Sequence, residues 1–554
     1  MRLRDGPGDP RVGALSGSEA LTGDNHVVPT PKGVRSEEAE LGRRHGQAAL
    51  DRGDLPEAFR QLQRALGQAQ EAGNDHQIAQ IEITLGTLAV NSGDLPTAEE
   101  RLRRAMGVME SLADKRCTSW AAYELGRWAL RAGRIAESIG LLEGSLEVAR
   151  ELKDNYRAAW RLQELGHALV FVDPARAASL LRDAAAEHES ISDGHGQRWA
   201  LLQLGQALVA TRDYAEAITA YEAAVDLATA EGDTHAVSFG ETRLGDLLRY
   251  QRKYEEAQAH LERGLRAAQA AGLRVEEGSA RKILGMVATS RRDYKAAVAH
   301  YDTALAIANS SGNPFELARI QSLLGSAYLS VGEVQTAEAL ATEALRSAQD
   351  ADWLDLQIST RLLLLRAGQA RGDTATALEH GREALDVTAR RPPDTVSIDV
   401  ELELSRLYLH EDDLDAAKSH VTSALATADA LGDQRRAALT ILELGATLCR
   451  QGEKEAALEL YYGRIPVDDP ILCARMRTEA GLLEADLGRP DLSAEQIQLA
   501  ETLYAEQEDI HQQAHCLDIL SKVYLQQGDL LRSRRSSRQA KELWPALGSC
   551  CQVT

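Results

Sequence analysis

Apolar and small residues recur along the chain with a period of about 40 residues. The clearest mark is a Leu-Gly pair, which repeats between residues 85 and 325 at intervals of 40, 40, 39, 40, 40 and 40 residues. The pairs are Leu85-Gly86, Leu125-Gly126, Leu165-Gly166, Leu204-Gly205, Leu244-Gly245, Leu284-Gly285 and Leu324-Gly325. A fixed period of this length is typical of a solenoid, in which one supersecondary unit stacks on the next.

Each unit contains signals for two helices joined by a short turn. About seven residues after the Gly comes a helix breaker followed by an N-cap residue, as in Gly53-Asp54, Gly93-Asp94 and Gly372-Asp373. Pro56 and Pro96 then fall in the first turn of the next helix, where a missing N–H costs nothing. Extending this register over the chain predicts thirteen helix–turn–helix units.

The second helix of each unit has a small residue twelve positions after the Gly, for example Ala58, Ala98 and Ala217. A small residue at one position in every unit indicates a close approach of two helix backbones. Apolar pairs such as Ala65-Leu66 and Ala304-Leu305 follow at helical spacing and extend the buried face.

These marks, together with Tyr214, Tyr254 and Tyr294 after the turn, resemble the tetratricopeptide repeat, and the resemblance covers roughly residues 36–545. It implies an all-α, right-handed superhelix whose first helices line a concave groove, and a function in binding other proteins. The usual unit has 34 residues. The longer period is similar to that of kinesin light chains, Leu-Gly-Asn-type G-protein-signalling modulators and the sensor arms of bacterial STAND regulators.

The pattern also predicts how the chain is divided. Residues 1–35 lack periodicity and are expected to form a disordered tail, with Ser36 capping the first helix. Residues 36–462 form the main array, and residues 463–470 an irregular kink because Pro466 and Pro470 forbid a regular helix. Residues 471–545 form a C-terminal repeat pair with a capping helix at 530–543, and residues 546–554 a flexible tail. The arginine-rich helix at 530–543 could alternatively be a basic docking site.

The charge narrows the choice of partner. The net charge of −22 disfavours nucleic acid and anionic membranes, whereas basic segments of a partner protein would be attracted. No apolar run approaches the length of a membrane-spanning helix. The scattered cysteines, without a secretory signal, favour a cytoplasmic location.

Candidate chemistry is sparse. The sequence has no phosphate-binding glycine loop, no Gly-x-Ser-x-Gly motif and no His-Glu-x-x-His pair. His511 and His515 lie one helical turn apart, but no third and fourth ligand accompany them, so no metal site is predicted. His188 and His195 are interpreted as loop residues on either side of an Asp-Gly turn. We therefore expect no enzymatic activity and no cofactor.

One set of residues stands out. Six positions before the Gly, four consecutive units carry Trp120, Trp160, Trp199 and Phe239. If the first helices line a groove, these rings form a row along one wall, and tryptophan is enriched in binding hot spots. The other groove candidates on the same helices are Tyr123, Arg127, Arg131, Gln163, His167, Gln203, Gln206, Asp246, Arg249 and Tyr250. The alternative is that each ring only covers the junction with the neighbouring unit.

The sequence thus predicts a non-enzymatic scaffold or adaptor that binds a peptide or helix in its concave groove. One alternative is a regulatory or sensor arm of a bacterial signalling or transcription-control system that acts on a partner chain. Another is a sensor of a small molecule or lipid, which would need a closed apolar cavity.

Overall fold

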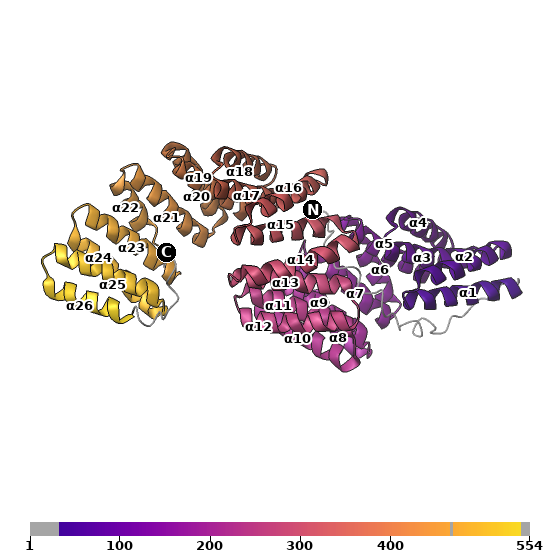
Figure 1. Ribbon diagram of the computed structural model, residues 1–554. Helices are drawn as coiled ribbons and strands as arrows, with labels where there is room; N and C mark the ends of the chain where they lie inside the picture. Colours follow the sequence, from indigo (N-terminus) through magenta and orange to yellow (C-terminus); the bar gives the residue numbers. More distant parts are fainter. Residues whose placement is uncertain (1–32, 466–468, 544–554) are drawn as a thin grey trace. The chain divides into compact units, whose positions relative to one another are not determined.

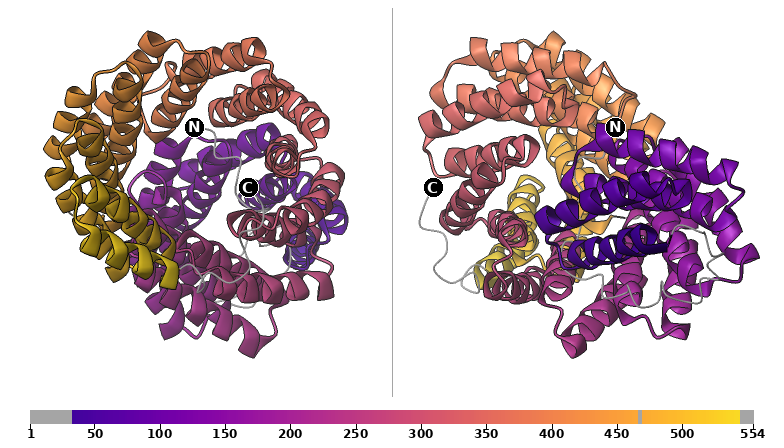
Figure 2. Two further views of the ribbon diagram at one scale, coloured as in Figure 1. Left: turned by 60° about the vertical axis from the view of Figure 1, so that its left-hand side comes forward. Right: turned by 90° about the vertical axis from the view of Figure 1, so that its right-hand side faces the viewer.

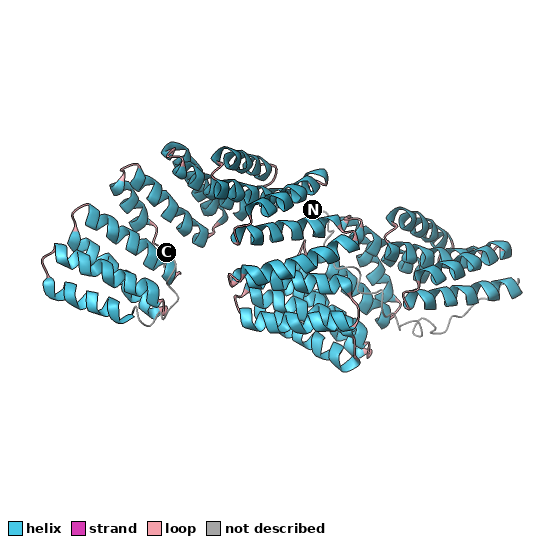
Figure 3. Cartoon of the chain, viewed as in Figure 1, coloured by secondary structure: helices cyan, strands magenta, loops and turns pink. Residues whose placement is uncertain are grey.

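The computed structural model describes residues 33–465 and 469–543. Within these ranges the chain forms 26 α-helices and no β-strand (Figure 3). Within each of the chain's two compact units, consecutive helices pack as pairs, and each pair packs on the next one in sequence (Figures 1 and 2). The thirteen helix pairs confirm the repeat number predicted from the period.

The chain divides into two compact units, with the boundary between Ile320 and Gln321. The helices of the first unit are α1 (Gly33–Asp51), α2 (Leu55–Ala72), α3 (Asp75–Ser92), α4 (Leu95–Ser111), α5 (Lys115–Arg131), α6 (Ile135–Glu151), α7 (Asn155–Leu169), α8 (Pro174–Ser190), α9 (Gly194–Ala210), α10 (Tyr214–Glu231), α11 (Thr234–Tyr250), α12 (Tyr254–Ala270), α13 (Arg274–Ser290) and α14 (Tyr294–Ser311). Helix α15 (Pro314–Ser330) contains the boundary.

The second unit contains the remaining helices. They are α16 (Val334–Asp350), α17 (Leu354–Arg371), α18 (Thr374–Thr388), α19 (Thr395–His410), α20 (Leu414–Leu431), α21 (Gln434–Arg450), α22 (Lys454–Gly463), α23 (Pro470–Asp486), α24 (Pro490–Glu506), α25 (Ile510–Gln526) and α26 (Leu530–Leu543).

The turns between helices have the predicted chemistry. Gly53 takes a φ of 76°, and the Asp54 carboxylate accepts a hydrogen bond from Glu57 N at 3.1 Å. Before α8, where no glycine stands in the turn, Asp173 caps the helix and Pro174 is its first residue. Arg212 occupies the turn position that Gly53 has in the first repeat, and its φ is 67°. A non-glycine residue thus adopts the left-handed conformation there.

The glycine of the Leu-Gly pair marks the closest contact inside each helix pair. A Cβ on Gly86 would lie 2.6 Å from the Leu102 side chain, and one on Gly205 would lie 2.5 Å from the Tyr221 ring. The small residue twelve positions later, such as Ala98, is fully buried. These contacts are part of a hydrophobic core that continues from repeat to repeat. In the first unit, one cluster of buried residues extends from Leu142 to Val287.

One expectation about the helix ends is wrong and another is confirmed. Helix α1 begins at Gly33, so Ser36 does not cap it. Instead, the Ser36 hydroxyl donates a hydrogen bond to Gln77 Oε1 at 2.7 Å on α3. Helix α22 is short, with 10 residues, as expected ahead of the prolines. The predicted domain boundaries at 462, 463–470 and 471 stay predictions, and residues 1–32, 466–468 and 544–554 lie outside the described residues.

Candidate functional site

All the predicted groove residues lie on odd-numbered helices of the first unit. These helices contact the next odd-numbered helix as well as their sequence neighbours, as α5 does with α7, α7 with α9 and α9 with α11. Successive helix pairs therefore lie closest together on the side formed by their odd-numbered helices. We call the side formed by α5, α7, α9 and α11 the odd-helix face.

Three of the four predicted rings form a connected row on this face. The Trp160 ring lies 6.0 Å from the His195 ring, and His195 lies 6.4 Å from Trp199. Trp199 in turn lies 5.7 Å from Phe239, with the planes tilted by 54°. The row therefore links α7, α9 and α11 at spacings typical of aromatic pairs.

Burial differs along the row. Trp199 is only 4% exposed and belongs to the core cluster, whereas Trp160 and Phe239 are half-buried. Trp120 is also half-buried and packs on the preceding cluster, around Leu125 on α5. Trp199 thus fits the packing interpretation, whereas the rings on either side of it keep part of their surface accessible.

Histidines that the sequence interpretation missed surround the row. His188 lies in the last turn of α8 and is fully buried, and its ring meets Trp160 edge-on at 5.0 Å. His195 lies in the first turn of α9, and His235 on α11 is 5.6 Å from Trp199. The loop assignment of His188 and His195 is wrong because Asp193 caps α9, so the helix begins at Gly194.

Polar candidates near the row are mostly tied into the scaffold. Arg127 donates to Glu124 at 2.8 Å and to Asn91 on α3 at 3.3 Å, and both charged groups are buried. Arg131 donates to the Val90 carbonyl at 2.6 Å. These arginines join neighbouring repeats, so they are not available as ligand-binding groups.

Several buried polar atoms close to the row have no hydrogen-bond partner among the described residues. They include Oε1 of Gln163 on α7, Nε2 of His188 on α8, and Nε1 of Trp199 and Oε1 of Gln203 on α9. Most buried polar atoms in folded proteins are paired, with protein or with ordered water. Of the remaining candidates, His167 and Gln206 are half-buried on the same two helices.

A cleft of about 330 Å³ opens at the other end of α9 and α11. Three predicted residues, Asp246, Arg249 and Tyr250, line it, and the first two form an ion pair at 2.7 Å. The Tyr214 and Tyr250 rings, 5.6 Å apart, form a second wall. Arg243 joins the cleft to the aromatic row, because its guanidinium lies 4.8 Å from the Phe239 ring.

Residues 37–111, 196–270 and 276–350 match the family model of the tetratricopeptide repeat. These three segments of the chain are tetratricopeptide repeats. No curated protein sequence matches the chain.

Solved structures share this fold. A signal transduction ATPase with numerous domains (STAND) from Pyrococcus horikoshii, which has a tetratricopeptide repeat sensor, matches with a TM-score of 0.50 and 17% identity over 66% of this chain and 54% of that chain. This chain thus spans about half the length of that protein. The apo form of the quorum sensor NprR from B. thuringiensis matches with a TM-score of 0.46 and 16% identity over 72% of this chain and 99% of that one. At such identities, the first match shows a common fold.

The described part of the chain also has one group of potential metal ligands, which the sequence did not predict. His76 Nε2 lies 2.8 Å from Asp114 Oδ2, and the Cys117 thiol lies within 4.8 Å of both. However, burial raises the pKa of the Cys117 thiol to about 11, which favours the protonated form. Asp114 is also the N-cap of α5 and accepts from Cys117 N, so the group is explained as a contact between repeats.

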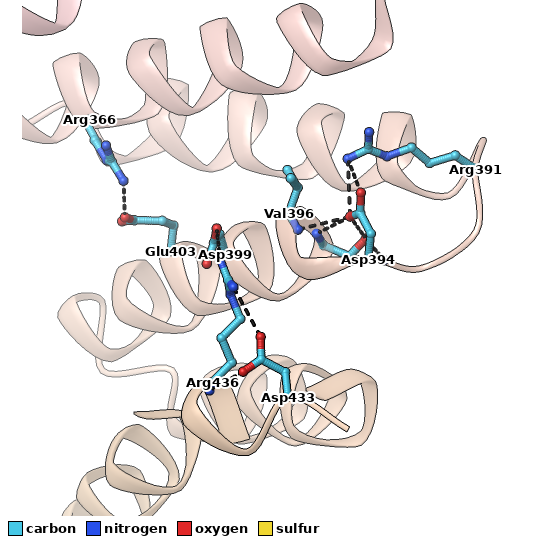
Figure 4. Close-up of polar contacts among 9 residues, drawn as sticks. Arg366, Arg391, Asp394, Val396, Asp399, Glu403, Asp433 and Arg436 are labelled. Carbon is cyan, nitrogen blue, oxygen red and sulfur yellow. Dashed lines mark hydrogen bonds and ion pairs between the residues drawn. The ribbon is translucent and has the colours of Figure 1, made fainter. Parts of the chain in front are cut away.

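In the second unit of the chain, ion pairs join successive odd-numbered helices (Figure 4). Arg366 on α17 donates to Glu403 on α19 at 2.6 Å. Arg436 on α21 lies 3.4 Å from Asp399 on α19 and 3.3 Å from its own N-cap, Asp433. The polar groups of this face are thus largely paired with one another. Among the described helices of both units, none is long and apolar enough to cross a membrane.

Proposed function

We propose that this chain is a binding scaffold that takes up a peptide segment of a partner protein along the odd-helix face of its first unit. The observation that carries the proposal is the row Trp160–His195–Trp199–Phe239 across three successive repeats. Such a row places rings at similar spacings across α7, α9 and α11, and the half-buried Trp160 and Phe239 keep part of their surface for an extended chain laid across these helices.

The burial pattern supports recognition by the outer rings. Trp199 is fixed in the core, and it holds the half-buried Phe239 in contact at 5.7 Å. Rigid aromatic side chains with part of their surface accessible are typical binding hot spots, because little side-chain entropy is lost when a partner covers them.

The polar atoms near the row support a peptide as the ligand. Gln163 Oε1 and Gln203 Oε1 are acceptors and Trp199 Nε1 is a donor, and all three are buried without a partner among the described residues. An unpaired buried polar group costs about 1–3 kcal/mol. These atoms are covered in the unbound chain, so a peptide backbone, which supplies alternating N–H and C=O groups, would pair with them after the neighbouring side chains move aside.

The proposal is tested by selecting peptides from a displayed random library against the full chain and measuring the affinity of a selected peptide. Replacing Trp160 or Phe239 with alanine should weaken binding at least about tenfold while the melting temperature changes little. Phe59→Ala is the matched control, because Phe59 is an exposed ring, 48% accessible, on the even-numbered helix α2. An equal loss in the control, or no loss in either variant, would contradict the proposal.

The regulatory-arm hypothesis differs only in the identity of the partner. Capture of an ATPase or a DNA-binding protein through the same aromatic row would favour it over a general adaptor. The net charge of −22 favours partner segments that are basic away from the row.

A further inference from the structure

The cleft between the C-terminal halves of α9 and α11 differs from the rest of the face in its charge. Arg212, Arg243 and Arg249 line it, against a single carboxylate, that of Asp246. Arg249 is paired with Asp246 at 2.7 Å. Since Arg212 and Arg243 form no ion pair among the described residues, two guanidinium groups remain to face the cleft.

Other contacts do not neutralise these two groups. The Arg243 guanidinium lies 4.8 Å from the centre of the Phe239 ring, a cation–π contact that does not neutralise its charge. Asp213, next to Arg212 in sequence, is exposed and accepts a hydrogen bond from the Thr211 hydroxyl at 2.7 Å. It does not line the cleft.

The apolar parts of the cleft suit a side chain with an acidic end. Tyr250 is 63% exposed, and its ring lies 5.6 Å from that of Tyr214 in the preceding repeat, with the planes tilted by 57°. Val209 lines the same wall. A methylene stem can pack on these groups while its carboxylate reaches a guanidinium, which presents paired N–H donors that match a carboxylate.

We propose that this cleft binds an acidic side chain of the bound peptide segment, a proposal that rests on the peptide-binding function above. Charge complementarity identifies the occupant: in a chain with a net charge of −22, the cleft carries three arginines and one carboxylate. An acidic residue would therefore mark one position of the segment, next to the residue that contacts Phe239.

The test uses the full chain and short peptides that carry the same neutral dye. Hexaglutamate should bind, and hexaglutamine should bind at least about tenfold more weakly, since a hydrogen bond to a charged group contributes that much. Arg243→Gln or Arg212→Gln should each weaken hexaglutamate binding severalfold. Asp246→Asn should strengthen it, because the competing carboxylate is removed; a merely structural role would not give this opposite sign.

Arg346→Gln is the matched control, since Arg346 is exposed on α16 in the second unit and the substitution removes the same charge. A loss in Arg346→Gln equal to that in Arg243→Gln would overturn the proposal, because the effect would then be one of net charge. Equal binding of hexaglutamate and hexaglutamine would also overturn it. If library-selected peptides still depend on Trp160 and Phe239 in that case, the proposed function stands and only the acidic subsite fails.

Discussion

Nδ1 of His260 on α12 lies 2.6 Å from Oε2 of Glu241 on α11. Arg263, on the next turn of α12, donates to the other oxygen of this carboxylate at 2.7 Å. The same positions are used four repeats later, where His420 Nδ1 lies 2.5 Å from Glu401 Oε2. A buried acid on the first helix of a repeat is thus paired with a basic residue on the second.

This pairing makes the first unit sensitive to acid. Burial alone would raise the pKa of Glu241, but hydrogen bonds from His260 and Arg263 hold it below its ordinary value of 4.5. Because the pKa is lower in the folded state, the carboxylate stabilises the fold above pH 4.5, and this contribution is lost as the pH falls through the folded-state pKa. Urea denaturation should show the free energy of unfolding falling steeply below about pH 4.5.

Glu241→Gln should be less stable than the wild type at neutral pH and should lose less stability on acidification. Glu222→Gln, at an exposed position on α10, should leave the pH profile unchanged. If the two variants gave the same profile, the pairing of Glu241 would not contribute to acid sensitivity.

The burial of Trp199 leads to a second prediction. Trp199→Ala removes a ring that is 4% exposed and touches both His235 and Phe239, so it should lower the free energy of unfolding by about 3–5 kcal/mol. Phe239→Ala should cost clearly less, because that ring is half-buried. Thermal melting followed by circular dichroism measures both, and similar melting temperatures for the two variants would contradict this division of roles.

The helix contacts at the Leu-Gly pair give a third prediction. An alanine at Gly205 would place its Cβ 2.5 Å from the buried Tyr221 ring, so Gly205→Ala should destabilise the chain by about 1–3 kcal/mol. Gly140, inside α6, has no atom within 4 Å of the same position. Gly140→Ala should instead stabilise the chain by up to about 1 kcal/mol, because alanine is the better helix former. Opposite signs in chemical denaturation are the expected result.

The fold was predictable because its determinants are local. Gly53-Asp54 specifies a helix end and a cap through backbone geometry alone, and Gly86 and Ala98 specify a close approach that any larger residue would disturb. Such signals repeat with the unit, so thirteen copies reinforce one another. The prediction that Ser36 caps the first helix was wrong because its hydroxyl bonds to Gln77 on a neighbouring helix. Such a contact cannot be predicted from the residues next to Ser36 in the sequence.

The candidate site was less predictable because it depends on contacts between repeats. Trp160 and Trp199 share one repeat position, and each meets a histidine of the next repeat, His195 and His235 respectively. Trp199 also contacts the Phe239 ring of that repeat, which contributes to its burial. The histidines could have been noticed in the sequence, because His195 and His235 both lie ten residues before the Gly of their unit. No sequence pattern marked Arg243, because its position matters only in the cleft that two repeats form together.

Arg161 on α7 gives the last prediction. It is buried, its Nε donates to Ser145 Oγ at 2.6 Å, and its guanidinium lies 5.1 Å from the Tyr123 ring. It forms no ion pair among the described residues, and burial lowers its pKa to about 10, so the charged form is held at a cost. Ser145 keeps a partner without it, because its hydroxyl also donates to the Ser119 carbonyl at 2.7 Å.

Arg161→Met preserves most of the side-chain volume and removes the charge, so it should leave the free energy of unfolding unchanged or raise it by up to about 4 kcal/mol. Arg161→Ala should lower it, because a cavity replaces the side chain. Urea denaturation of both variants at neutral pH separates the two contributions. A methionine variant as unstable as the alanine variant would mean that the charge itself, through the Tyr123 ring and the Ser145 hydroxyl, stabilises this part of the first unit.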